Sequence, residues 1–96
     1  MLKIYLTSLG CKLNQAETES LARHIEGRGH QVVTDPLQAD WAIINTCTVT
    51  HVAARKSRRL IRHLHRTSAS LRLAVIGCYA EMSPEEIGGI SGVDLV

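Results

Sequence analysis

The stretch LTSLGCKLNQAETES, residues 6–20, decides the fold because it passes directly from a strand pattern into a helix pattern. Residues 2–9, LKIYLTSL, alternate and are rich in strand formers. Asn14, with Glu17 three residues later, is predicted to cap the N-terminus of a helix. Gly27 and Gly29 are predicted to end this helix. The chain therefore opens as strand, loop and helix. Its loop carries a cysteine where nucleotide-binding α/β proteins usually have a glycine-rich turn for phosphate.

Strand and helix patterns continue to alternate along the rest of the chain. Further strands are predicted at QVVTD (31–35), WAIINT (41–46), RLAVIG (72–77) and VDLV (93–96). A second helix is predicted at about Val52–His65. The capping box SPEE (83–86), with its proline in the first helical position, predicts a third helix, which is short because Gly88 follows. This alternation predicts an α/β fold of the three-layer Rossmann or flavodoxin-like type, with a mostly parallel sheet of about five strands. Residues 1–96 form one small domain.

Composition indicates the cellular compartment of the protein and the redox state of its cysteines. Of the 96 residues, 45% are hydrophobic, but no apolar run approaches the roughly 18 residues that a membrane span needs. The first residues also lack the basic-then-apolar order of a signal peptide. We therefore expect a cytoplasmic protein without membrane contact, in which the three cysteines stay reduced. Metal binding, reactivity and core packing remain open for these thiols, and the oligomeric state is unknown.

The basic residues are concentrated in one predicted helix. Six of the eleven lie within twelve residues: Arg55, Lys56, Arg58, Arg59, Arg62 and Arg66. No Asp or Glu occurs between Trp41 and Ala80. The inner stripe of the same helix is predicted to consist of Ala53, Ser57, Leu60, Ile61 and Leu64. The cationic face indicates contact with RNA phosphates or with an acidic neighbouring domain, and the alternative is a solvated helix face.

Each cysteine follows a predicted strand. Cys11 comes after the first strand, Cys47 after WAIINT and Cys78 after RLAVIG. Ligands of open parallel sheets bind at the carboxyl ends of the strands, where neighbouring strands lie about 4.8 Å apart. Three thiols there can share one metal centre. A closed structural zinc site takes four protein ligands, whereas a cubane iron-sulfur cluster takes one thiolate per iron, so that three thiolates leave one iron open.

Three segments around these cysteines carry a family resemblance. They are GCKLNQ (10–15), INTCTVT (44–50) with KSR (56–58), and GCYA (77–80). Together they resemble the cysteine segments of the methylthiotransferase N-terminal domain, in the same order and over nearly the whole chain. The resemblance implies a radical S-adenosylmethionine enzyme that adds a methylthio group. It also implies that Cys11, Cys47 and Cys78 bind an auxiliary [4Fe-4S] cluster, whose open iron binds the transferred sulfur.

The resemblance also indicates a substrate and a missing part. KLNQ (12–15) and NTCTVT (45–50) are most similar to the branch that modifies N6-threonylcarbamoyladenosine beside the tRNA anticodon, whereas Ala16 departs from that branch. The branches that modify isopentenyladenosine or a ribosomal protein aspartate remain open. The C-x-x-x-C-x-x-C motif of the radical centre does not occur in the 96 residues. S-adenosylmethionine and a second [4Fe-4S] cluster are therefore expected in a radical domain elsewhere in a longer protein, and this piece alone is expected to be inactive.

Three polar residues near the cysteines have alternative roles. Lys12, Asn14 and Asn45 are candidates for ordering the cluster loops, whereas Lys12 could equally be an exposed loop residue and Asn14 a helix cap. A competing interpretation of the whole chain is a nucleotide-binding or receiver-like α/β module whose cysteines only pack. A thiol redox enzyme is a second competitor, but it usually has two cysteines close in sequence, and here they are far apart.

Overall fold

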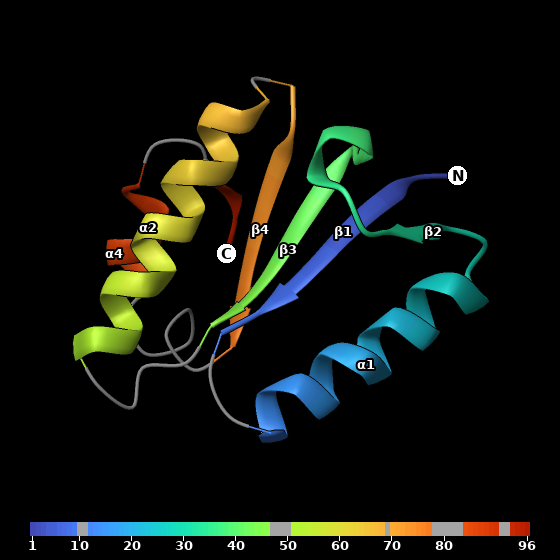
Figure 1. Cartoon of the computed structure of the whole chain (residues 1–96), viewed down its shortest axis with the longest axis horizontal. Helices are drawn as coiled ribbons and strands as arrows, with labels where there is room; N and C mark the ends of the chain where they lie inside the picture. The colour runs from blue at the N-terminus through green and yellow to red at the C-terminus, as the bar shows by residue number, and fades with distance from the viewer. Residues whose placement is uncertain (10–11, 47–50, 69, 78–83, 91–92) are drawn as a thin grey trace.

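Within the described part of the chain, five strands form one fully parallel sheet in the order β2-β1-β3-β4-β5 (Figure 1). The strands are β1 (Lys3–Ser8), β2 (Gln31–Val33), β3 (Trp41–Thr46), β4 (Arg72–Gly77) and β5 (Val93–Leu95). The predicted bounds of β3 and β4 are confirmed at both ends. The order reverses direction between β1 and β3, as in flavodoxin-like folds.

The structure is a computed structural model, and it describes residues 1–9, 12–46, 51–68, 70–77, 84–90 and 93–96. Its helices are α1 (Lys12–Gly27), the 3-10 helix η1 (Pro36–Gln38), α2 (His51–Thr67) and α4 (Pro84–Gly88). Helix α1 packs against β1 and β2, and α2 packs against β3 and β4. Because the two crossovers run in opposite directions along the sheet and both are right-handed, these helices cover opposite faces and produce the predicted three layers (Figure 1).

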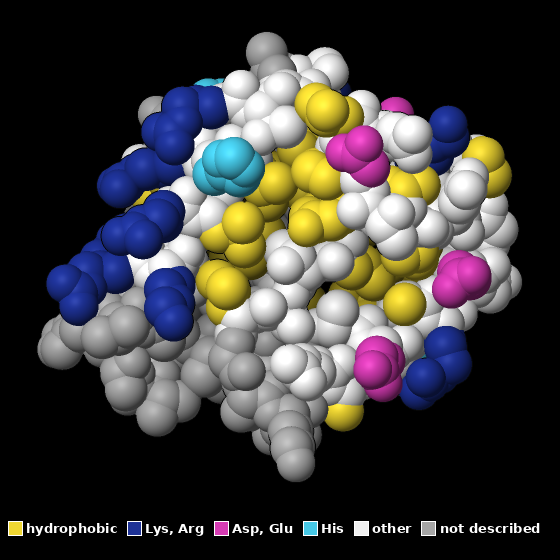
Figure 2. All heavy atoms as spheres, in the orientation of Figure 1, with side chains coloured by type: hydrophobic (Ala, Val, Ile, Leu, Met, Phe, Trp, Pro, Cys, Tyr) yellow, Lys and Arg dark blue, Asp and Glu magenta, His cyan; other side chains and the backbone are white. Residues whose placement is uncertain are grey.

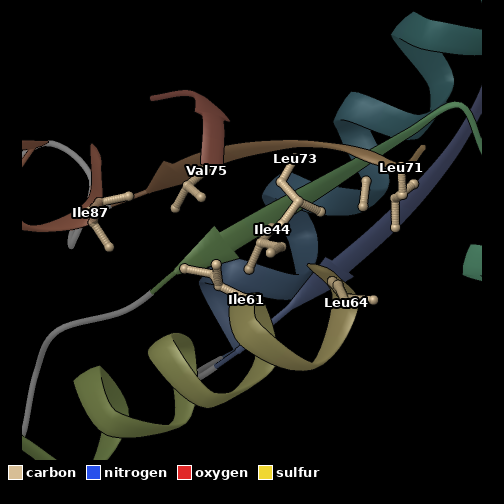
Figure 3. Packing of buried hydrophobic residues seen from close by; sticks show 8 residues of the cluster. Ile44, Ile61, Leu64, Leu71, Leu73, Val75 and Ile87 are labelled. Atoms are coloured by element: carbon tan, nitrogen blue, oxygen red, sulfur yellow. The ribbon is translucent and has the colours of Figure 1, made fainter. Parts of the chain in front are cut away.

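The core lies between β3, β4 and the inner face of α2. Ile44 and Leu73 of the sheet and Ile61 of α2 have no exposed surface. Figure 3 shows Ile61 and Leu64 pointing from α2 toward the strands. The inner stripe predicted for this helix is confirmed at Ser57, Ile61 and Leu64, which are buried, and at Leu60, which is half-buried. The side chain of Ala53 lies outside the described residues.

Local patterns misplaced the start of α1 and the end of β2. Helix α1 begins at Lys12, so Asn14 is its third residue and the prediction of Asn14 as its cap is wrong. The connection from β1 is short, and the helix starts as soon as the chain has left the sheet. Strand β2 ends at Val33 instead of Asp35, because Asp35 caps η1 by accepting a hydrogen bond from the Leu37 amide at 3.0 Å.

We predict that Ile61→Ala lowers the free energy of unfolding by about 2–5 kcal/mol, because it leaves a cavity between α2 and the sheet. Ile76→Ala is the matched control, since the same side chain is 37% exposed there. Its effect should be about 1 kcal/mol or less. Urea unfolding followed by circular dichroism measures both changes, and equal losses would contradict the assignment of the core.

Candidate metal centre

The carboxyl ends of β1, β3 and β4 lie side by side. Ser8 of β1 is in register with Asn45 of β3, and Thr46 of β3 is in register with Gly77 of β4. Beyond β1, the Leu9 amide donates a hydrogen bond to the Asn45 carbonyl at 3.0 Å. Neighbouring strands of a sheet are about 4.8 Å apart. The chain therefore leaves the sheet at three adjacent points of one edge, at the lower end of the strands in Figure 1.

The three cysteines follow these points directly in sequence. Cys47 comes after Thr46, Cys78 after Gly77, and Cys11 two residues after Leu9. All three cysteines lie outside the described residues, so their convergence stays a prediction. The described residues bring the chain to one edge immediately before each of them, which is the arrangement that a shared site requires.

Two helices begin at the same edge. The first residues of α1 and α2 are Lys12 and His51, and neither helix has an acidic residue in its first turn (Figure 1). The partial positive charge at a helix N-terminus stabilises a nearby anion by about 0.3–1 kcal/mol. Thiolates and thiolate-bound clusters are anionic, so both helices favour them at this edge.

Asn45 is buried beside the edge and ties β3 to α1. It is 2% exposed, and its side-chain Nδ2 donates a hydrogen bond to Thr18 Oγ1 at 3.2 Å. A buried amide must find such partners, since leaving one unmade costs about 1–3 kcal/mol. Sequence reasoning did not identify Thr18 as the partner of Asn45. The predicted role of Asn45 near a cluster stays a prediction.

Thr46 and Gly77 hold the ends of β3 and β4 together. Thr46 is fully buried, and its Oγ1 donates to the Ile76 carbonyl at 2.7 Å. Gly77 has a φ of +97°, and a Cβ there would meet the Thr46 carbonyl oxygen and, at 2.5 Å, Asn45 Oδ1. Only glycine fits this close approach without displacing its neighbours. Sequence reasoning used Gly77 only as part of a Gly-Cys pair and missed its structural role.

Lys12 and Asn14 occupy the first turn of α1, one to three residues after Cys11. Asn14 lies one helical turn before Thr18 in sequence. Their side chains lie outside the described residues. In the parts of the chain that are described, no group of three or more His, Cys, Asp or Glu side chains is placed to hold a metal ion.

The cationic side chains predicted for the second long helix are on its outer face. Arg55, Lys56, Arg59, Arg62 and Arg66 are exposed, and Arg58 is half-buried. Figure 2 shows dark-blue side chains following α2 along one margin of the molecule. The predicted separation of an apolar inner face from a basic outer face is confirmed.

Comparison with known proteins identifies the family. Residues 3–96 match the family described as "Uncharacterized protein family UPF0004". The chain belongs to this family. It is 41% identical over 96 residues, its whole length, to a threonylcarbamoyladenosine tRNA methylthiotransferase, MtaB, of Bacillus subtilis. The resemblance to the methylthiotransferase N-terminal domain is thereby confirmed.

Relatives named for other substrates are also similar to the chain. A ribosomal protein uS12 methylthiotransferase, RimO, of Chloroflexus aurantiacus is 32% identical over 97% of the chain, and a tRNA-2-methylthio-N(6)-dimethylallyladenosine synthase of Chlorobium phaeobacteroides is 31% identical over 98%. The chain spans only about a fifth of the length of these relatives, 21% and 22%, and 21% of the Bacillus protein. In the residues described, no helix is both long enough and apolar enough to cross a bilayer.

We predict that Gly77→Ala is more destabilising than Gly29→Ala. Both glycines have a positive φ, +97° and +88°, so both substitutions carry a backbone strain of about 1–2 kcal/mol. A Cβ at Gly29 meets nothing within 4 Å, whereas one at Gly77 collides with β3. The collision should add about 1–3 kcal/mol. Urea unfolding of the two variants measures the difference, and equal losses would show that the strand ends are not in close contact at Gly77.

Proposed function

We propose that this UPF0004 chain is the cluster-carrying domain of a tRNA methylthiotransferase, which adds a methylthio group to N6-threonylcarbamoyladenosine beside the anticodon. Cys11, Cys47 and Cys78 would hold an auxiliary [4Fe-4S] cluster. One observation carries the proposal: the ends of β1, β3 and β4 are adjacent, and a cysteine follows each of them in sequence.

The chemistry of the donor set favours a cubane cluster over zinc. A closed structural zinc site takes four protein ligands, so the three cysteines of the chain would need a fourth ligand, such as a histidine. In a cubane, each thiolate binds one iron, so three cysteines leave a fourth iron for an external sulfur ligand. The N-termini of α1 and α2 at the same edge, without acidic residues in their first turns, support binding of an anionic cluster. When bound, the cluster would supply the iron that takes up the sulfur to be transferred.

The chain's own residues would position the thiols. The hydrogen bond from Asn45 to Thr18 sets the end of β3 against α1, and that from Thr46 to the Ile76 carbonyl sets it against β4. These contacts precede Cys47 and Cys78 by one or two residues, so little backbone freedom separates the sheet from the thiols. Lys12 and Asn14, in the first turn of α1, would order the loop that contains Cys11.

The remaining machinery belongs to a separate domain. The 96 residues contain no C-x-x-x-C-x-x-C motif, so S-adenosylmethionine and the second [4Fe-4S] cluster are assigned to a radical domain, without which this chain is inactive. The partners are that domain and tRNA. The site of action is the cytoplasm, where thiols stay reduced.

The substrate assignment follows the names of the relatives. The Bacillus protein named for threonylcarbamoyladenosine is 41% identical, against 32% and 31% for those named for ribosomal protein uS12 and dimethylallyladenosine. KLNQ (12–15) and NTCTVT (45–50) support the same branch, although Ala16 departs from it. The names of these relatives do not favour a nucleotide-binding or receiver-like module with structural cysteines.

Anaerobic reconstitution with iron and sulfide tests the cluster. The wild-type chain should gain the broad visible absorption of a cubane and about four irons per chain. Cys11→Ala, Cys47→Ala and Cys78→Ala should each lose most of the iron after desalting, because each removes one of three ligands. Oxygen must be excluded, since thiols that converge without iron oxidise readily.

Ser70→Ala is the control for this experiment, because Ser70 is exposed and precedes β4 at the opposite edge of the sheet. It should retain the full iron content. A wild-type chain that stays colourless, or three cysteine variants that all keep a full-strength cluster, would refute the proposal.

A further inference from the structure

The outer face of α2 is lined by arginines. Five of them border a groove of about 380 Å³: Arg55, Arg58, Arg59, Arg62 and Arg66. In sequence, no Asp or Glu occurs between Trp41 and Ala80. Figure 2 shows that the Asp and Glu side chains visible on this side of the molecule lie away from the row of basic side chains. Solvated helix faces usually mix both signs, so this concentration of one sign indicates an anionic partner.

The arginines follow the helix axis at regular intervals. Arg55, Arg59 and Arg62 are spaced i, i+4 and i+7, and Arg66 continues the row at i+11. At 1.5 Å per residue, the row is about 16 Å long and successive members are about 4.5–6 Å apart along the helix axis. Successive phosphates along a nucleic-acid strand have a comparable separation. The planar guanidinium group also binds two phosphate oxygens at once, which lysine cannot do.

The same face lacks the features of a protein interface. Protein interfaces have an apolar, often aromatic centre inside a polar rim. None of the exposed large hydrophobic side chains in the described residues belongs to α2. Ile61 and Leu64 of this helix are buried against the sheet. The groove therefore offers charge without an apolar centre, which fits a phosphate backbone better than an acidic protein surface.

We propose that the arginine groove of α2 binds the phosphate backbone of RNA independently of sequence. This inference rests on the proposed function, which makes tRNA the partner. Helix α2 begins at the edge where β1, β3 and β4 end, and Arg55 is four residues from its start (Figure 1). A strand bound along the groove therefore reaches the edge that the cysteines follow. The groove contributes affinity and orientation, since phosphate contacts carry no base readout.

The double variant Arg59→Gln/Arg62→Gln tests this inference. Both side chains are exposed on the groove. The measurement is fluorescence anisotropy of an unmodified anticodon stem-loop RNA, titrated with the metal-free chain at several salt concentrations. Affinity should fall about tenfold or more at low salt. The slope of log Kobs against log salt should become shallower by about 1.4, because two phosphate contacts are lost at about 0.7 each.

Arg23→Gln/Arg28→Gln is the matched control. It removes the same charge from exposed residues of a second groove, of about 410 Å³, on α1. Because α1 covers the opposite face of the sheet, RNA affinity should change less than about threefold. Both double variants should keep the thermal unfolding midpoint of the wild type.

Equal weakening by the two double variants would reduce the effect to net charge and overturn the inference. An unchanged affinity in the α2 variant would also overturn it and would leave docking on an acidic domain as the role of this face. Iron reconstitution separates these outcomes from the proposed function: the α2 variant should still assemble a full cluster, whether or not it binds RNA.

Discussion

Parallel pairing of β1, β3 and β4 is the constraint on which the rest of the structure depends. Parallel strands all run the same way, so their carboxyl ends meet at one edge, and the return connection between neighbouring strands usually contains a helix, such as α1 or α2 here. Residues far apart in sequence, such as Ser8, Asn45 and Ile76, thereby become neighbours. The pairing is stabilised by burial of Ile44, Leu73 and Val75, which have no exposed surface. The position of a site at this edge is therefore fixed by the packing of the core.

The edge is also fixed by contacts more specific than hydrophobic packing. Asn45 is a buried amide that bonds Thr18 across the boundary between sheet and helix. Thr46 and Gly77 bring two backbones closer together than any side chain at residue 77 would allow. Such contacts restrict the strand ends to one arrangement, because the alternatives bury an unpaired polar group or force a collision. Rigid strand ends suit a site whose ligands come from three separate loops.

Sequence patterns predicted the fold well where periodicity is strong. WAIINT and RLAVIG each contain three consecutive buried residues, and their predicted bounds coincide with β3 and β4. Ser57 was placed on the inner stripe of α2 from spacing alone, and it is fully buried. The start of α1 was missed because a capping pattern at Asn14 is a local signal, whereas the helix begins where the chain leaves the sheet. The contact between Asn45 and Thr18 and the close approach at Gly77 depend on pairing between distant segments, which no local pattern encodes.

An anaerobic crystal structure of the iron-loaded chain tests the central claim most directly, namely that three distant cysteines meet at one edge of the sheet. The account predicts a single cubane beside the ends of β1, β3 and β4, with the sulfur atoms of Cys11, Cys47 and Cys78 each on a different iron and the fourth iron free of cysteine. A structure in which any one of these sulfur atoms lies on the opposite edge, or packs under a helix away from the cluster, would contradict it.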